Sequence, residues 1–252
     1  MSEMTWKALV PRVVKIQAPN PSTTAGDGSR WWRDDRYVDF ASRHALRWLG
    51  RNWITWHYNK FPGAYLKNAR DVVILLDELA SAGVMPRLTS TSRVFEGGCS
   101  LGRNLLAIQD AYGCEVVGMD LSPLGVRYAR EKVWNRRTRW DIFEDDGLSS
   151  TWFKSVPDRA FDLALSRWHL IHIQASPAKT AYINEMRRIS RTLLVLEPPP
   201  QKPGGSVEYH YGGDYVLSRD DWAATYGLRE FQPRASMENT GVYYARNTSA
   251  GA

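Results

Sequence analysis

A glycine-rich turn between a predicted strand and a predicted helix constrains this chain more than any other feature. The strand ends in FEGGCSLG (residues 95–102), and a helix is predicted from about 103 to 111. Backbone N–H groups face outward in such a turn, and glycines, which lack side chains, let a ligand approach closely. The turn predicts a ligand site, with a tight turn that binds nothing as the alternative.

The chain around this turn alternates between strand and helix patterns. Helices are predicted at 68–82, from Ser122-Pro123 onwards, from Ser176-Pro177 to about 189 and near 219–226; strands are predicted at 115–119, 140–143, 161–165, 192–196 and 242–245. Serine before proline starts a helix, because serine caps free N–H groups and proline needs no partner at the first position. The alternation indicates an α/β fold with a mostly parallel sheet and helices on both faces.

Composition divides the chain into three predicted regions. Residues 1–29 form a flexible arm or linker, since 18–29 read APNPSTTAGDGS; residues 30–90 form a helical, Trp-rich cap; and residues 91–252 form the ligand-binding domain. The sequence has no apolar run that could span a membrane and no recognisable secretion signal, and it has two cysteines. We therefore expect a cytoplasmic protein without a membrane partner, a disulfide scaffold or a metal site.

Residues near the turn narrow the choice of ligand. A dinucleotide fingerprint is absent, because Cys99 stands where its second glycine belongs, and no P-loop lysine follows. Glu96 ends the first strand, where its carboxylate would repel a pyrophosphate but suits the sulfonium and ammonium groups of S-adenosylmethionine. Asp120 ends the second strand, at about the spacing at which an acid accepts two ribose hydroxyls.

Taken together, these segments resemble the class I S-adenosylmethionine-dependent methyltransferases. The resemblance covers residues 93–200 and rests on FEGGCSLGRNL, EVVGMDLSP, FDLALSRWHLIHI and LLVLEPPP, in the order and spacing of that family. It implies a Rossmann-like sheet of seven strands in the order 3-2-1-4-5-7-6, with the last strand antiparallel. It also implies S-adenosylmethionine as the cofactor, with S-adenosylhomocysteine as its product. Ser100 departs from the glycine of many members, although a small residue should fit.

The resemblance assigns roles to individual residues. Those expected around the methionine part of the cofactor are Glu96, Gly98, Cys99, Gly102 and Asn104. Asp120, followed by Leu121, matches the acid that binds the ribose. Asp146, with Asp145 one residue away, matches the acid that accepts the adenine amino group. Ser166 and Arg167 match the turn beneath the sulfonium.

The acceptor side is predicted from histidine and aromatic residues. His169 and His172 follow the fourth strand, where family members face the methyl acceptor; His169 is the preferred general base, with packing or capping as the alternative role. Trp168 and the Trp-rich segment 30–66 are predicted to contact the acceptor, with core packing as the alternative. Within that segment, the residues predicted to contact the acceptor are Trp53, Trp56, His57 and Tyr58.

The predicted function is transfer of a methyl group to oxygen or nitrogen of a small molecule, of natural-product or sugar type, by a monomer or homodimer. The formal net charge of +6 permits an RNA or DNA methyltransferase as an alternative. Against it, the fourth strand ends in SRWH rather than in the Asn/Asp-Pro-Pro-Tyr/Phe signature of base amino-methyltransferases. A second alternative is a non-catalytic protein that binds the cofactor.

Overall fold

The computed structural model describes residues 62–134, 136–170, 173, 176–197, 225–234 and 240–247. The predicted arm at 1–29 lies outside this part of the chain, as do most of the Trp-rich segment and most of the helix expected near 219–226. None of the helices in the described ranges is both long and apolar enough to cross a membrane.

A seven-stranded sheet forms the centre of the molecule, in the order β3-β2-β1-β4-β5-β7-β6. Strands β1 to β5 pair in parallel, β7 runs antiparallel to β5, and β6 runs antiparallel to β7. The predicted Rossmann-like fold and its strand order are thus confirmed. The strands are β1 (Arg93–Gly97), β2 (Glu115–Asp120), β3 (Trp140–Glu144), β4 (Phe161–Arg167), β5 (Ser190–Glu197), β6 (Arg229–Phe231) and β7 (Gly241–Arg246).

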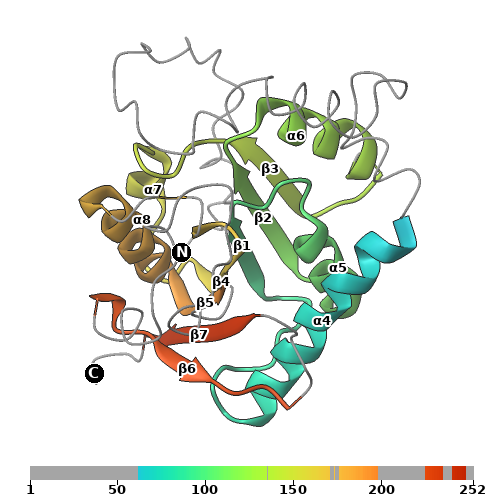
Figure 1. Ribbon diagram of the computed structural model, residues 1–252. Coiled ribbons are helices and arrows are strands. Elements are labelled where there is room, and N and C mark those ends of the chain that lie inside the picture. Colours follow the sequence, from blue (N-terminus) through green and yellow to red (C-terminus); the bar gives the residue numbers. More distant parts are fainter. Residues whose placement is uncertain are drawn as a thin grey trace, which may run out of the picture.

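Helices cover both faces of this sheet (Figure 1). One face carries α4 (Pro62–Ser81), α5 (Arg103–Tyr112) and α6 (Pro123–Tyr128), and a π-helical turn at Ala129–Val133 follows α6 directly. The other face carries α7 (Trp152–Ser155) and α8 (Pro177–Arg188). The chain passes from the first group of helices to the second through β3, so residues from both faces can reach the carboxyl ends of the strands.

Each face has its own hydrophobic core. On the α4 side, Val72, Leu75, Leu76 and Leu79 recur at helical spacing and pack with aliphatic residues of α5 and the strands. The α8 side is aromatic instead: the Phe95 and Trp152 rings stack with centroids 5.1 Å apart, and Phe161 lies 5.6 Å from Phe95. Helix α4 therefore shares a core with the sheet that follows it in sequence.

Both predicted Ser-Pro helix starts are confirmed. The Ser122 hydroxyl accepts the N–H of Gly125 over 3.1 Å, and the Ser176 hydroxyl accepts that of Lys179 over 3.2 Å. These bonds satisfy N–H groups that the first turn of a helix leaves free. Serine therefore sets the first residue of both α6 and α8.

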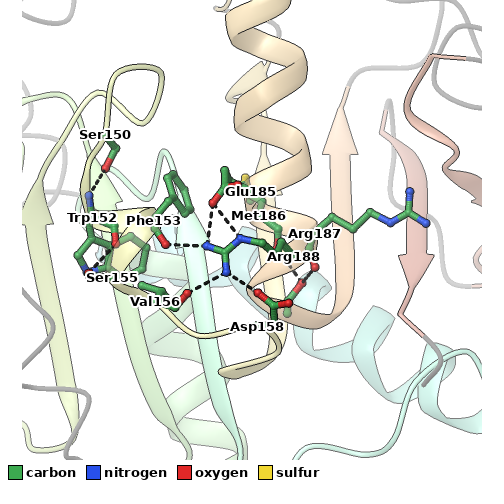
Figure 2. A network of polar contacts seen from close by, with 11 residues as sticks. Ser150, Trp152, Phe153, Ser155, Val156, Asp158, Glu185, Met186, Arg187 and Arg188 are labelled. Carbon is green, nitrogen blue, oxygen red and sulfur yellow. Dashed lines mark hydrogen bonds and ion pairs between the residues drawn. The ribbon is translucent and has the colours of Figure 1, made fainter. Parts of the chain in front are cut away.

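Arg188 fastens the segment after β3 to helix α8, as Figure 2 shows. Its guanidinium donates to the carbonyls of Phe153 and Val156, over 2.6 and 2.9 Å, and it pairs with Asp158 and Glu185 at 2.7 and 2.8 Å. These carboxylates raise the pKa of Arg188 further above its already high ordinary value. One side chain thus gives the short helix α7 a fixed position under the sheet.

Candidate active site

The carboxyl ends of β1, β2 and β4 meet at one edge of the sheet. Gly97 at the end of β1 pairs with Met119 of β2 on one side and with Ser166 of β4 on the other. The chain leaves β1 towards β2 and returns on the opposite side as β4, so the strand order reverses here. Ligands of open α/β sheets bind at such a switch point.

The glycine turn after β1 has three residues in the left-handed backbone region. Gly98 has a φ of 69°, Ser100 of 52° and Gly102 of 73°. Serine adopts this conformation at a cost of roughly 1–2 kcal/mol, which explains why glycine suits position 100. The N–H of Ser100 donates to Asp120 Oδ2 over 2.6 Å, and this charge-assisted bond offsets the cost.

Asp120 holds the turn and the start of the next loop together. Besides Ser100, its carboxylate accepts the N–H of Ser122 at Oδ1 over 2.9 Å. Burial raises its pKa, while these backbone N–H groups act in the opposite direction. Two carboxylate oxygens offer about four acceptor positions, so the carboxylate can still receive hydroxyl groups besides these backbone bonds.

Glu96 is the most unusual carboxyl of the site. It is 1% exposed, and Oε1 accepts an N–H from the Asn104 side chain over 2.6 Å, whereas Oε2 has no hydrogen-bond partner among the described residues. Burial raises the pKa of Glu96 to about 8. The Asn104 oxygen accepts from Arg167 over 3.3 Å, so β1, α5 and β4 are linked. A cationic group beside Oε2 would satisfy the carboxylate and favour its ionised form.

Two acids follow β3 at the same edge. The N–H of Asp145 donates to the backbone carbonyl of Asp120 over 3.0 Å, which brings the two loops together. The Asp145 carboxylate accepts from Gly147 and Ser150, each over 2.9 Å, and burial raises its pKa. Asp146 accepts twice from Ser149, over 2.8 and 2.7 Å. Hydrogen bonds of the turn therefore orient both acids.

Trp168 and His169 leave β4 in different directions. Trp168 has a φ of 53°, a left-handed conformation that bulky residues rarely adopt, and its indole N–H donates to the Thr240 hydroxyl over 3.3 Å. His169 lies on the glycine turn, where its ring occupies the space that a side chain at Gly98 would need. Strained backbone of this kind concentrates at functional sites.

Three residues of this edge were not among the predicted site residues. Tyr182 of α8 lies between Gly97 and Gly147, and its ring meets His169 edge-on with centroids 5.8 Å apart. Lys179 and Glu197 are buried beside the loop after β4. The signals were present in the sequence: Glu197 ends an otherwise apolar strand, and Lys179 interrupts the apolar stripe of α8.

Other predicted residues differ in their surroundings. Cys99 is 4% exposed and its thiol packs close to Gly118 in the α4-side core, where burial raises its pKa well above the ordinary value. Ser166 is fully buried at the end of β4, and Leu121 is partly buried after Asp120. Five acceptor-side residues lie outside the described residues, namely Trp53, Trp56, His57, Tyr58 and His172.

Residues 94–192 match a family model described as a methyltransferase domain. Over 86 residues the chain is 33% identical to the phosphoethanolamine N-methyltransferase of Triticum aestivum; the alignment covers 34% of this chain and 16% of that much longer protein. The solved structure of PigF with SAH is similar to this chain with a TM-score of 0.50 at 17% identity, and the match covers 62% of this chain and 50% of that one.

A complex between the Haloferax volcanii Trm112 methyltransferase activator and a candidate methyltransferase gives a TM-score of 0.51 at 15% identity, covering 75% of this chain and 96% of the matched one. Identities this low show a shared fold. The family model adds sequence agreement from β1 into β5, across the edge where the predicted cofactor residues gather. Over residues 94–192 the chain is therefore similar to a methyltransferase domain, and its sheet has the strand order that the resemblance to class I S-adenosylmethionine-dependent methyltransferases predicts.

Proposed function

We propose that this protein transfers a methyl group from S-adenosylmethionine to nitrogen or oxygen of a small molecule. The observation that carries the proposal is the buried Glu96 carboxyl, whose Oε2 has no hydrogen-bond partner in the described part of the chain, with His169 on the same glycine turn. The carboxyl suits a cationic ligand, and the imidazole lies where a neighbouring reactant would arrive.

The residues at the strand ends fit the parts of the cofactor. Glu96, with Asn104 behind it, would hold the cationic methionine part, and Asp120 would accept the ribose hydroxyls. Asp145 and Asp146 would offer an acceptor to the adenine amino group. When bound, the cofactor supplies an electrophilic methyl carbon on a sulfonium. The protein's own residues align the acceptor atom with that carbon and exclude water.

His169 is proposed to take the proton of the acceptor. The imidazole is held from two sides, by the glycine turn and by the Tyr182 ring, which limits its rotation. A general base must stand within about 3 Å of the proton it removes, so a fixed ring favours this role. Trp168 and the Trp-rich segment would supply the apolar wall of the acceptor site.

The name of one relative supports the proposed acceptor class. The Triticum aestivum protein is named for methylation of an amine nitrogen, which supports a small amine or hydroxyl compound over a nucleic acid. We further propose that residues 1–29 are an arm, that residues 30–90 are a helical extension of the domain, and that the protein acts in a cytoplasmic biosynthetic reaction. Under this proposal, residues 30–66 form most of the acceptor side.

A turnover assay tests the proposal. The full chain is incubated with S-adenosylmethionine and, in separate reactions, with small amines such as phosphoethanolamine, phenols, sugars, and transfer RNA, and release of S-adenosylhomocysteine is measured. We expect turnover with a small amine or hydroxyl compound and none with RNA. Turnover with RNA alone would contradict the acceptor class. Cofactor binding without turnover on any acceptor would favour the non-catalytic alternative.

A further inference from the structure

Two buried ionisable side chains hold the loop that follows β4 by its backbone. Glu197 Oε1 accepts the N–H groups of His169 and Leu170, over 3.2 and 2.8 Å. The Lys179 ammonium donates to the carbonyls of Leu170 and Ile173, over 2.8 and 2.9 Å. Glu197 is 1% exposed and Lys179 is 0% exposed. We call this pair, with the four hydrogen bonds just described, the loop clamp.

The Glu197 carboxylate accepts hydrogen bonds from the chain just beyond the point where the backbone pairing of β4 with β5 ends. The last bond between β4 and β5 runs from the N–H of Trp168 to the carbonyl of Leu196. At this point Trp168 turns into the left-handed conformation and the chain leaves the sheet. Glu197, the next residue of β5, supplies a side-chain acceptor for the two N–H groups that follow.

The lysine is costly to bury, and an apolar residue would fit its position. Lys179 shares the buried stripe of α8 with Tyr182, Ile183 and Met186. Lysine is almost never fully buried unless it is paired, because removing its charge from water is expensive. Burial lowers its pKa to about 8, although the charge of Glu197 opposes this change. Its ammonium binds the carbonyls of Leu170 and Ile173, which flank residues 171 and 172 in the sequence.

We propose that Lys179 and Glu197 are positioning residues for His169. This inference rests on the proposed function, because it assigns the clamp a purpose in methyl transfer. The clamp fixes the backbone at His169, Leu170 and Ile173, so the side chain of His169 starts from a backbone of defined position. Misplacing a reacting group by about 1 Å can cost roughly 100-fold in rate, which makes such a frame valuable.

The alternative is that the clamp only stabilises the fold. A destabilised protein loses activity and cofactor affinity together and exchanges its amide hydrogens faster throughout. Loss of a positioning contact instead frees a few amides and lowers kcat, while the cofactor site keeps its affinity. These patterns can be separated with variants of equal stability loss.

The experiment compares clamp variants with matched controls in the full chain. Lys179→Met removes the ammonium and keeps the volume, Glu197→Leu removes the acceptor, and Glu197→Gln restores an acceptor oxygen. Ile108→Ala is the destabilised control, because Ile108 is buried in α5 on the opposite face of the sheet. Lys154→Met is the control for loss of an exposed lysine in α7. The readouts are amide hydrogen exchange, the Kd of S-adenosylhomocysteine, and kcat with the acceptor found in the turnover assay.

We expect amide exchange at residues 169–173 to accelerate at least about tenfold in Lys179→Met and Glu197→Leu, beyond the change in Ile108→Ala, because each variant removes bonds at those residues. Glu197→Gln should recover most of the protection. The clamp variants should lose kcat at least about tenfold, with Kd within about twofold. The inference would be overturned if the changes in amide exchange and in kcat followed the loss of overall stability in the same way in clamp and control variants. Exchange needs no methyl acceptor, so its result remains distinct if the proposed turnover fails.

Discussion

Asn104 donates its side-chain N–H to Glu96 Oε1 over 2.6 Å, which joins the first turn of α5 to the carboxyl at the end of β1. The bond satisfies one oxygen and leaves Oε2 without a hydrogen-bond partner in the described residues. A buried acid in this state resists ionisation until a cation arrives. The relationship therefore couples the protonation of Glu96 to ligand binding.

The first prediction concerns the pH dependence of cofactor binding. In the free protein the pKa of Glu96 is raised to about 8, so Glu96 is mostly protonated at pH 6. A bound cation favours the ionised form, so affinity for S-adenosylmethionine should rise as the pH rises from 6 to 8. Glu96→Gln should lose this rise. Calorimetry of both proteins at each pH isolates Glu96 from titration of the cofactor itself, and identical slopes would contradict the coupling.

Asp120 should serve both binding and stability. Asp120→Ala removes a charged acceptor of hydrogen bonds worth about 1.5–3 kcal/mol each, so the Kd of S-adenosylmethionine should increase about tenfold or more. The variant also strips an acceptor from the N–H groups of Ser100 and Ser122, so its Tm should fall. Asp158→Ala, which removes an exposed carboxylate that pairs with Arg188, is the control for the Kd. An unchanged Kd, measured by calorimetry, would mean that the ribose binds elsewhere.

The third prediction distinguishes the two histidines. His169→Ala should lower kcat by roughly 100-fold or more if His169 removes a proton, since general bases contribute about that much. Cofactor affinity should remain within about threefold, because the Glu96 and Asp120 contacts stay intact. His172→Ala, measured in the same turnover assay, should have the smaller effect. The reverse order would assign the base to His172.

A fourth prediction addresses the Trp-rich segment. Trp53→Ala, Trp56→Ala and Tyr58→Ala should raise the KM of the acceptor more than that of the cofactor, because aromatic walls bury an organic acceptor. Steady-state kinetics with each reactant varied in turn measure the two effects. Equal increases, accompanied by a lower Tm, would indicate that these residues pack in a core.

The fifth prediction concerns Lys179, whose burial should make the free energy of unfolding depend on pH in the alkaline range. The pKa of Lys179 is lowered from 10.5 to about 8 in the folded protein. Between these two values the unfolded chain binds more protons than the folded one, so the free energy of unfolding should rise with pH. Lys179→Met should lack this contribution. Urea unfolding of both proteins at pH 7.5, 9 and 10.5 measures the difference, which should grow in favour of the wild type as the pH rises.

Much of the sheet could be predicted because its signals are local. The glycine turn, the Ser-Pro helix starts and the apolar fifth strand each mark a boundary within a few residues of sequence. Strand β6 could not be placed, because the three residues of Arg229–Phe231 are too few for a visible pattern. The π-helical turn at Ala129–Val133 was also not predicted, since it continues a helix without a break in composition.

The positions of Glu96 and Asp120 at the edge of the sheet could be predicted, because each residue lies at the end of its own strand. Tyr182 and Lys179 were not predicted as residues of this edge, because they lie on α8. Only the tertiary packing of α8 brings them to the loops that follow β1 and β4. For Ser100, the sequence indicated a small residue, and the structure adds the reason: a positive φ held by Asp120.

The Tyr182 ring fills space left by Gly97 and Gly147, so three positions far apart in the chain make up one steric unit. A side chain at either glycine would collide with the ring, and a smaller residue at 182 would leave a void beneath the turn. None of the three can change freely while the others stay as they are. Related sequences should therefore exchange residues 97 and 182 together, with a bulkier residue at 97 accompanied by a slimmer one at 182, while the positive φ of 67° keeps glycine at 147.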